Sequence, residues 1–423
     1  MSTFPSTTAA NGSVPTQRPG SKQSSHDGVL ERLTKLVPSS DAYATEVVDA
    51  ILDFADAVGT SDVHLQPTRS GLEVKYRSNG VLQILGIFPV GSRSSIISRL
   101  KVLSGLLTYK SDVPQEGRVE SPRHGREIRV STFPTLYGER GVLRFFGHAR
   151  EFTTLEELGN PVELTHLIRD SLDETSGAIL ITGPAGSGKS TTLYACLRHL
   201  VTHNNGARSV VSLEDPIEVP VDGVAQSEVD LAAGFDLKTG LRSLMRQDPE
   251  VIIVGEIRDR DTAEFAIQAS LTGQLLLATF HADSAASAIT RLIEMGIEPF
   301  LVRSGLIAVI CQRLLRVLCS CSRESTDAAD FCGIPLEKAR VAVGCPACNS
   351  TGYSQRAIIS EFLDLRRAEL GPPILHRADS REIHRIARTC GMSPLGEQAI
   401  ELVRRGTTSP AEVVRVLGSA ARS

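Results

Sequence analysis

The stretch GAILITGPAGSGKSTTLYACLRHL, residues 177–200, decides the fold class of this chain. A short apolar run leads into GPAGSGKS (183–190), which fills every fixed position of the GxxxxGK[ST] pattern, and a helix-competent segment follows. In a strand–loop–helix unit of this kind the glycines let backbone amides turn inward on a phosphate chain. The sequence therefore predicts an α/β domain that binds a nucleoside triphosphate.

The phosphate loop supplies nine candidate nucleotide contacts. We expect Lys189 to neutralise the β- and γ-phosphates and the hydroxyl of Ser190 to ligate Mg²⁺. The Asn-Lys-x-Asp guanine reader of GTPases is absent, which favours ATP. A chance glycine-rich turn is the alternative, and the flanking strand and helix argue against it. The candidates are Gly183, Pro184, Ala185, Gly186, Ser187, Gly188, Lys189, Ser190 and Thr191.

Polar side chains follow three later apolar runs. SVVSL is followed by Glu214, Asp215 and Glu218, VIIVG by Glu256, and LLLATF by His281. In an open parallel sheet the ligand lies beyond the carboxyl ends of the strands, so we expect these groups to converge on the phosphate loop. A solvated turn is the alternative for any one acidic strand end. For His281, a structural histidine that bonds a neighbouring backbone is the alternative to γ-phosphate sensing.

Composition excludes several other classes of protein. The chain has 423 residues, enough for two or three domains, with 41% hydrophobic and 22% charged residues. A net charge of −4 argues against a general nucleic-acid binder. The longest apolar runs fall short of the ~20 residues that cross a bilayer, and no secretory signal is visible. These features predict a globular protein that is neither secreted nor embedded in a membrane.

The pattern of apolar residues divides the chain into five segments. Helices and strands alternate irregularly before the phosphate loop, whereas strands and helices alternate regularly around it, as in a mostly parallel buried sheet. The predicted segments are 1–27 (a disordered tail), 28–150 (an α+β domain), 151–315 (the P-loop core), 316–360 (a cysteine-bearing segment) and 361–423 (a helical end).

The order of motifs after the phosphate loop resembles one known family. LEDPIE (213–218) is followed by GLRSLMRQDPEVIIVGEIRD (240–259) and then by LLLATFHAD (275–283), which matches an Asp box, an atypical Walker B with Gly-Glu, and a His box. Upstream, SDVHLQP (61–67) and REIRVSTFPTLYGE (126–139) resemble the domain that precedes the ATPase core. The chain thus resembles the secretion ATPases of type II secretion systems and type IV pilus assembly.

The resemblance implies a fold and an assembly. It implies a RecA-like P-loop NTPase domain preceded by a smaller α+β (PAS-like) domain, with a zinc-clip insertion and a helical end. It also implies a homohexamer in which ATP lies between the P-loop domain and arginines of the preceding domain.

Roles for individual residues follow from the same resemblance. Glu256 is implied as the catalytic carboxylate and His281 as a sensor of the nucleotide. Glu214, Asp215 and Glu218 are implied to act on Mg²⁺ and water. Guanidinium groups suit the charge of a phosphoryl transition state, although each arginine is alternatively a surface charge on a strand. The implied arginines are Arg77, Arg118, Arg129 and Arg144.

Two positions depart from the family pattern in the N-terminal domain. Gln66 stands where the SDxHxEP motif has an acid, and Asn79 stands where the R-x-D-G motif has an aspartate. These changes put polar contacts of that domain in question and leave the ATPase motifs intact.

The cysteines predict a metal clip. Cys345 and Cys348 form one close pair, and with the family in view the other pair is Cys319 and Cys321, after a helix expected to end in RLLRVL. Four thiolates suit tetrahedral Zn²⁺. The first pair has one intervening residue where the family usually has two, so Cys332 as a substitute ligand and thiols without metal are the alternatives. Core positions in helical patterns are expected for Cys196, Cys311 and Cys390.

We therefore expect a cytoplasmic ATPase, peripheral to the inner membrane, that powers pseudopilus or pilus assembly and protein export. Expected partners are inner-membrane platform and docking proteins, without direct nucleic-acid binding, and the additional N-terminal docking domain of many members is not expected here. The alternatives are a DNA-uptake or pilus-retraction motor on the same core, and an ATP-binding scaffold without turnover. The intact Lys189, Ser190 and Glu256 argue against the scaffold.

Overall fold

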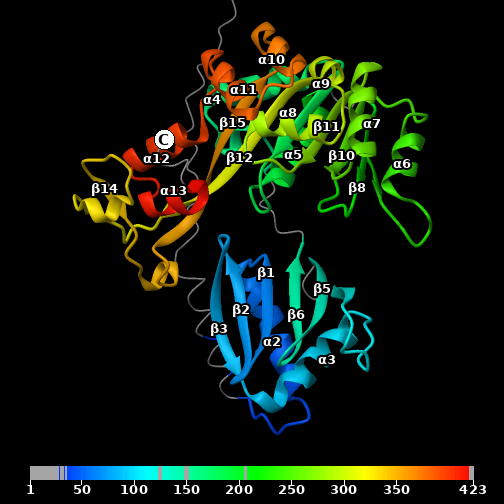
Figure 1. Ribbon diagram of the computed structural model, residues 1–423. Coiled ribbons are helices and arrows are strands. Elements are labelled where there is room, and N and C mark those ends of the chain that lie inside the picture. Colours follow the sequence, from blue (N-terminus) through cyan, green and yellow to red (C-terminus); the bar gives the residue numbers. More distant parts are fainter. Residues whose placement is uncertain are drawn as a thin grey trace, which may run out of the picture.

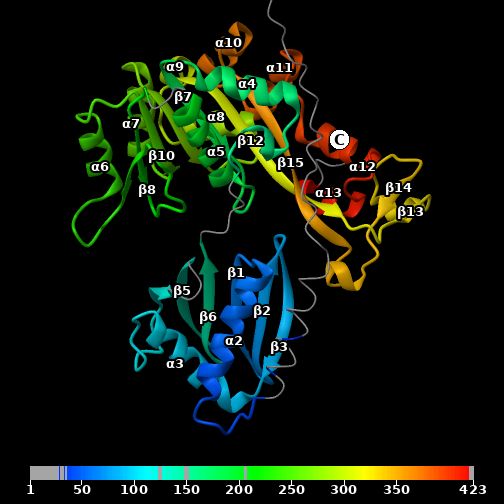
Figure 2. The same ribbon diagram turned by 180° about the vertical axis from the view of Figure 1, so that it is seen from behind.

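The computed structural model describes residues 36–121, 126–146, 152–203 and 207–418, together with Gly28 and Leu33. The predicted tail, 1–27, lies outside the described residues. Figures 1 and 2 show a smaller domain, built from the N-terminal part of the chain, below a larger one.

The smaller domain is a six-stranded antiparallel sheet with two helices on one face. Its strand order is β3-β2-β1-β6-β5-β4. The elements are α2 (Tyr43–Val58), β1 (Asp62–Thr68), β2 (Gly71–Ser78), β3 (Val81–Phe88), η1 (Val90–Ser92), α3 (Arg93–Leu103), β4 (Gln115–Ser121), β5 (Arg126–Thr135) and β6 (Gly138–Phe145).

Alternation along the strands separates the two faces of this sheet. Buried apolar residues of α2 and α3 pack on the inner face, where Phe54 meets Tyr76 edge-to-face at 4.8 Å between ring centroids. The intervening residues of the same strands, such as Asp62, Arg77 and Arg144, point to the outer face. The alternating pattern of β1, β2 and β6 thus gives the sheet one apolar face and one polar face.

The larger domain is built on a seven-stranded sheet of order β15-β12-β7-β11-β10-β8-β9, parallel except for β15. A two-stranded hairpin, β13-β14, lies apart from it. The strands are β7 (Gly177–Thr182), β8 (Val210–Glu214), β9 (Ala225–Glu228), β10 (Val251–Ile257), β11 (Leu275–Phe280), β12 (Leu306–Leu318), β13 (Arg323–Ser325), β14 (Ala339–Val341) and β15 (Tyr353–Asp364).

Helices cover both faces of this sheet, so its central strands are apolar on both sides. Alternate strand residues pack against α4 and α5 on one face, and the others pack against a second set that includes α7 and α8. The helices are η2 (Glu156–Leu158), α4 (Val162–Leu172), α5 (Lys189–His203), α6 (Leu237–Leu244), α7 (Arg260–Leu271), α8 (Ala285–Glu294), α9 (Pro299–Gly305), η3 (Ala328–Phe331), η4 (Pro346–Cys348), η5 (Ala368–Leu370), α10 (Gly371–Leu375), α11 (Ser380–Thr389), α12 (Leu395–Arg404) and α13 (Pro410–Leu417).

The prediction of four parallel strands around the phosphate loop is confirmed by β7, β8, β10 and β11. The helix expected to end in RLLRVL is wrong, because those residues lie in β12, which pairs with β7 and β15. A long apolar run suits either a buried helix or a central strand, and the sheet decides between them here. Cys311 is accordingly a buried strand residue, and the strand β15 precedes the helical end.

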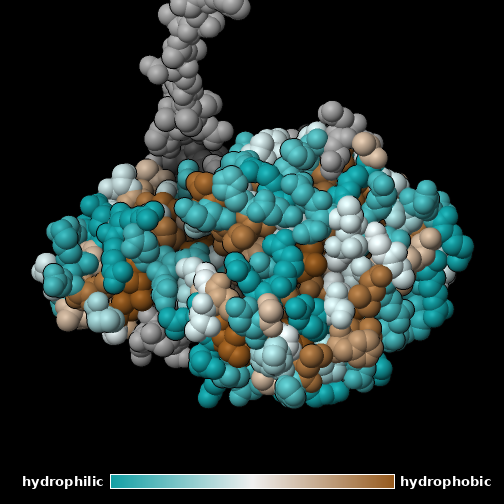
Figure 3. All heavy atoms as spheres, turned by 90° about the horizontal axis from the view of Figure 1, so that it is seen from above, coloured by the Kyte–Doolittle hydropathy of each residue, from teal (hydrophilic) through white to brown (hydrophobic). Residues whose placement is uncertain are grey.

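Seen from above, apolar side chains are scattered among hydrophilic ones on the surface of the larger domain (Figure 3). Within the described part of the chain, none of the helices combines the length and the apolar character needed to cross a membrane.

Candidate functional site

The phosphate loop joins the end of β7 to the start of α5. Gly183, Gly186 and Gly188 all have positive φ angles, and a Cβ on Gly183 would lie 2.6 Å from the backbone oxygen of Gln312. Only glycine adopts such a backbone without strain in so small a space. The glycines predicted to shape this loop therefore have the conformation that a phosphate cradle requires.

The ammonium group of Lys189 lies inside its own loop. It donates hydrogen bonds to the carbonyl oxygens of Gly183 (3.0 Å) and Pro184 (3.2 Å). Burial lowers the pKa of Lys189, and the nearby Glu256 carboxylate acts in the opposite sense. A partly desolvated cation, with a carboxylate close by, thus lies against the backbone carbonyls of the phosphate loop.

Gln312 of β12 fastens the loop from the neighbouring strand. Its side-chain Nε2 donates to the backbone oxygen of Ser187 (2.8 Å), and its Oε1 accepts from the hydroxyl of Thr192 (2.9 Å). Gln312 is fully buried. Sequence reasoning missed this residue because the segment around it was read as a helix, and the only signal available was the polar pair Gln312 and Arg313 in an apolar run.

Ser190 and Glu218 meet beside the loop. The Ser190 hydroxyl donates to Oε1 of Glu218 at 2.9 Å. Burial raises the pKa of Glu218, while the hydrogen bond from Ser190 and the positive charges of Arg144 and Lys189 lower it. A hydroxyl and a carboxylate side by side are oxygen ligands of the kind that Mg²⁺ prefers.

Glu214 lies deeper than the sequence suggested. It is 3% exposed, and its Oε1 accepts from Ser212 (2.7 Å) and Gln226 (3.0 Å) while its Oε2 accepts from the Tyr194 hydroxyl. The same hydroxyl accepts hydrogen bonds from the backbone N–H groups that follow β8, at Glu218 (3.0 Å) and at Val219 (3.4 Å). Through the Tyr194 hydroxyl, Glu214 thus supports the loop that carries Glu218. Sequence reasoning missed Tyr194.

Glu256 is held between a histidine and an arginine side chain at the end of β10. Nε2 of His281 lies 2.7 Å from its Oε1, and Nε of Arg258 donates to its Oε2 at 2.5 Å. Arg258 also reaches Oδ2 of Asp215 at 3.3 Å. The structure thus brings Glu256, His281 and Asp215 together as expected and adds Arg258, which the sequence indicated only as the residue two positions after Glu256.

The four predicted arginines lie in one row across the outer face of the N-terminal sheet. The register pairs Arg118 of β4 with Arg129 of β5, and Arg129 with Arg144 of β6. Asp62 of β1 then pairs with Arg144 on one side and with Arg77 of β2 on the other. Spacing along the chain gives no hint of this row, because four separate strands contribute to it.

One end of this row touches the larger domain. Nη2 of Arg118 donates to Oε1 of Glu228, on β9, at 2.8 Å. The other carboxylate oxygen of Glu228 accepts from the backbone N–H of Ile217 at 3.3 Å. Arg118 is thereby linked to the loop of Asp215 and Glu218, so the row of arginines faces the same chain's phosphate site.

The four predicted cysteine ligands converge. The Sγ atoms of Cys319, Cys321, Cys345 and Cys348 all lie within 4.8 Å of one another. The Sγ atoms of Cys319 and Cys345 and those of Cys321 and Cys348 are 3.9 Å apart, and those of Cys345 and Cys348 are 3.7 Å apart. Ligands of a tetrahedral ion with Zn–S bonds of about 2.3 Å are ~3.8 Å apart, so the donor set fits Zn²⁺.

The sulfur of Cys348 also accepts hydrogen bonds from backbone N–H groups. The donors are Cys345 (3.2 Å) and Gly352 (3.1 Å). Burial raises the pKa of Cys348, but these bonds outweigh it and lower the pKa to about 7. Cys332 is not a member of this cluster, so the structure does not support it as a substitute ligand.

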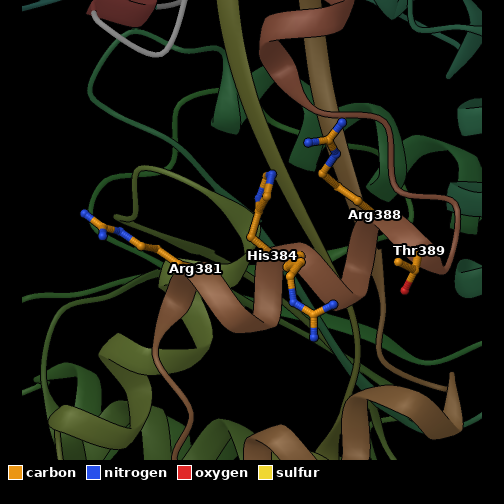
Figure 4. A pocket seen from close by; sticks show the side chains of 5 residues that line it. Arg381, His384, Arg388 and Thr389 are labelled. Carbon is orange, nitrogen blue, oxygen red and sulfur yellow. The ribbon is translucent and has the colours of Figure 1, made fainter. Parts of the chain in front are cut away.

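A shallow hollow beside α11 is a further charged feature of the larger domain. Its side chains diverge from the helix and do not aim at a common point (Figure 4). Two of them are already paired, Arg385 with Glu382 at 2.8 Å and Arg388 with Glu397 at 2.7 Å. The lining residues are Arg381, His384, Arg385, Arg388 and Thr389.

Comparison with known proteins agrees with this geometry. Residues 38–415 match the family model for "Type II/IV secretion system protein". The type II secretion system protein E of Pseudomonas aeruginosa is 39% identical over 403 residues, which are 92% of this chain and 78% of that protein. The type IV pilus assembly ATPase TfpB of Acinetobacter baylyi is 37% identical over 393 residues, 90% of this chain and 66% of that protein.

A solved structure shares the fold. The X-ray structure of the Legionella pneumophila ATPase DotB superposes with a TM-score of 0.64 over 89% of this chain and 97% of that chain. The sequences are 19% identical, so this likeness shows an α/β ATPase fold and nothing finer.

Proposed function

The chain belongs to the type II/IV secretion system protein family, and from that premise we propose that it powers pseudopilus or pilus assembly and protein export in a type II secretion or type IV pilus system. Like the ATPases of this family, it hydrolyses ATP. One observation supports the assignment above the others: Lys189, the Ser190–Glu218 pair and the Glu256–His281 pair meet at the carboxyl ends of parallel strands.

The roles of the loop residues follow from their contacts. The backbone amides of 183–191 and the ammonium of Lys189 bind the phosphate chain of ATP. Ser190 and Glu218 would hold Mg²⁺, which neutralises charge on the β- and γ-phosphates when it is bound. Gln312 keeps the loop in shape, because it bonds both to the loop backbone and to α5.

Glu256 orients the attacking water and accepts its proton in this proposal. Its two oxygens are held by His281 and Arg258, which fix the direction of the carboxylate. His281 then links the catalytic carboxylate to the state of the nucleotide. We assign Asp215 to hold Arg258, and Glu214 to hold the Glu218 loop through Tyr194, since the Glu214 carboxylate is buried away from the phosphate loop's surface while Glu256 is partly exposed.

The arginine row supplies positive charge from the N-terminal domain. Arg77, Arg118, Arg129 and Arg144 face the loop of Glu218 and stabilise the charge of the phosphoryl transition state. Because the row and the phosphate loop lie on different domains, opening and closing of the two domains couples hydrolysis to movement.

The remaining assignments are proposed on the family and on the fit of the donor set. We assign Zn²⁺ to the four-cysteine cluster, where it would tie the segment between β12 and β15 to the core. The working form is a homohexamer in the cytoplasm, bound peripherally to the inner membrane through platform and docking proteins, without direct contact to nucleic acid. The PAS-like description of the N-terminal domain and the five segment boundaries stay predictions.

A glutamine substitution at Glu256 tests the function most directly. Glu256→Gln keeps the shape but loses the base, so we expect kcat for ATP to fall by roughly 100-fold or more while ATP binding persists. Glu264→Gln, on the exposed side of α7, is the matched control and should hydrolyse ATP at the wild-type rate. Hydrolysis by Glu256→Gln at the wild-type rate would overturn the assignment.

A further inference from the structure

A carboxylate completes the row of arginines. In the register of the sheet, Asp62 occupies the position between Arg144 and Arg77. The side chain of Asp62 is 9% exposed, whereas that of Arg144 is 65% exposed. The row therefore contains one buried anion with a solvent-facing cation beside it.

Asp62 binds the inner edges of its two neighbours. Nε of Arg144 donates to Oδ1 at 3.0 Å, and Nε of Arg77 lies 3.4 Å from Oδ2, which also accepts from the Ser61 hydroxyl at 2.9 Å. Because the Nε groups are used for Asp62, the two Nη groups of Arg144 stay available to an anion in front of the sheet. The carboxylate thus fixes where the guanidinium points.

The row needs such a carboxylate because like charges face each other along it. Arg118, Arg129 and Arg144 are direct cross-strand neighbours, an arrangement that is unfavourable without counter-ions. Glu127 serves the other half of the row, 3.4 Å from Arg118 and 3.6 Å from Arg129, but its side chain is 30% exposed. Asp62 is the more deeply buried and more closely bound of the two anions.

The row is still short of acceptors and faces the nucleotide loop. The Nε and Nη2 atoms of Arg129 are buried and donate to no acceptor among the described residues. Burial raises the pKa of Glu218, the carboxylate bonded to Ser190, and the positive charge of Arg144 is near enough to act in the opposite sense. An anion with several oxygens, placed between the row and the phosphate loop, would accept from the exposed Nη groups of Arg144 and add negative charge to the row.

We propose that Asp62 is a positioning residue for phosphoryl transfer: it orients Arg144 and Arg77 so that their outer N–H groups meet the terminal phosphate of ATP. The inference rests on the proposed ATPase function. Asp62 lies on the N-terminal domain and acts on the nucleotide only through these two arginines.

The test compares ATP turnover and nucleotide binding in matched variants of the full chain. Asp62→Asn keeps the size of the side chain and removes its charge, and we expect kcat for ATP to fall about tenfold, as for loss of one aligned cation. The affinity for ADP, which lacks the terminal phosphate, should stay within about twofold in calorimetric titration. Glu73→Gln, on the same face of the sheet but paired with Lys75, should leave both quantities unchanged.

A double variant separates positioning from a general structural effect. If Asp62 acts through Arg144, then Asp62→Asn added to Arg144→Gln costs no further activity, because the arginine to be aligned is already gone. All variants are assayed well below their melting temperatures, so a destabilised variant is still measured in its folded form.

Three results would overturn the proposal: a kcat of Asp62→Asn equal to that of the wild type, an equal loss of ATP and ADP affinity, or losses that multiply in the double variant. These differ from failure of the proposed function, in which the wild-type chain itself does not hydrolyse ATP. In that case the comparison of ADP with a non-hydrolysable ATP analogue still tests Asp62, because only the analogue carries the terminal phosphate.

Discussion

Removal of one buried hydroxyl, in Tyr194→Phe, tests how the site is held together. The hydroxyl donates to the buried Glu214 carboxylate and accepts from the backbone N–H groups of Glu218 and Val219. Burial and the Glu214 carboxylate both raise the pKa of Tyr194, so the group acts as a neutral donor at physiological pH. Phenylalanine has the same ring and loses all three bonds at once.

The size of the effect follows from the charge of the partner. A hydrogen bond to a charged group contributes about 1.5–3 kcal/mol, and a buried donor left without a partner costs about 1–3 kcal/mol. Because these terms partly overlap, we expect Tyr194→Phe to lower the free energy of unfolding by about 2–4 kcal/mol. For a domain of this size that lowers the melting temperature by roughly 4–16 °C.

A second tyrosine provides the control. Tyr353 is also buried, and among the described residues its hydroxyl bonds only the hydroxyl of Ser409, at 2.6 Å and away from the phosphate loop. Tyr353→Phe should cost about 0.5–1.5 kcal/mol, the value for a bond between neutral groups. It should leave ATP turnover unchanged, whereas Tyr194→Phe should lower kcat/KM by roughly tenfold because Glu218 loses its anchor.

Both variants are measured by calorimetric melting and by steady-state ATPase kinetics. Equal losses of stability and of kcat/KM in the two variants would refute the reasoning, because they would show that the bond to Glu214 contributes no more to stability or activity than a bond between two neutral hydroxyls.

The further predictions concern the buried pair Glu412–Arg316, which joins α13 to β12, and the four-cysteine cluster. Glu412 is fully buried and accepts from Arg316 at 2.9 and 2.7 Å, so Glu412→Gln should destabilise the fold by about 3–5 kcal/mol in thermal melts, whereas the exposed Glu382→Gln should change stability by less than about 1 kcal/mol. Burial raises the pKa of Glu412, but its arginine partners outweigh burial and lower the pKa below 4.5. The contribution of Glu412 to the free energy of unfolding is therefore complete above pH 4.5 and is lost as the pH falls through the lowered pKa. In Glu412→Gln this part of the acid dependence of stability should be absent. Cys345→Ser should lose the bound zinc in metal analysis and melt at a lower temperature, and Cys332→Ser should keep its zinc; full zinc in Cys345→Ser would contradict the ligand set.

Local motifs carried most of what could be predicted about the fold. The phosphate loop, its strand and its helix are specified by residues that adjoin one another, so 183–190 could be assigned without any long-range information. The same holds for the antiparallel strands of the N-terminal domain, whose alternating pattern needs only one buried face. The phosphate loop, with β7 before it and α5 after it, is found where the sequence predicted it.

Long-range pairing explains where prediction failed. The residues of β12 form an apolar run that is compatible with a helix, and they form a strand because β7 and β15 supply partners on both edges. The error hid Gln312, which is meaningful only once β12 lies beside the phosphate loop.

The sequence by itself determined that this chain binds a nucleotide at a phosphate loop, that carboxylates and a histidine follow the next strands, and that two cysteine pairs are available. The tertiary structure alone decided how these groups are placed: Glu214 bonds Tyr194, Glu256 lies between His281 and Arg258, and the arginines form a row in which Asp62 stands between Arg144 and Arg77. The physical reason is that backbone conformation depends on adjacent residues. The surroundings of a charged side chain depend instead on strand order and register, which bring distant residues into contact.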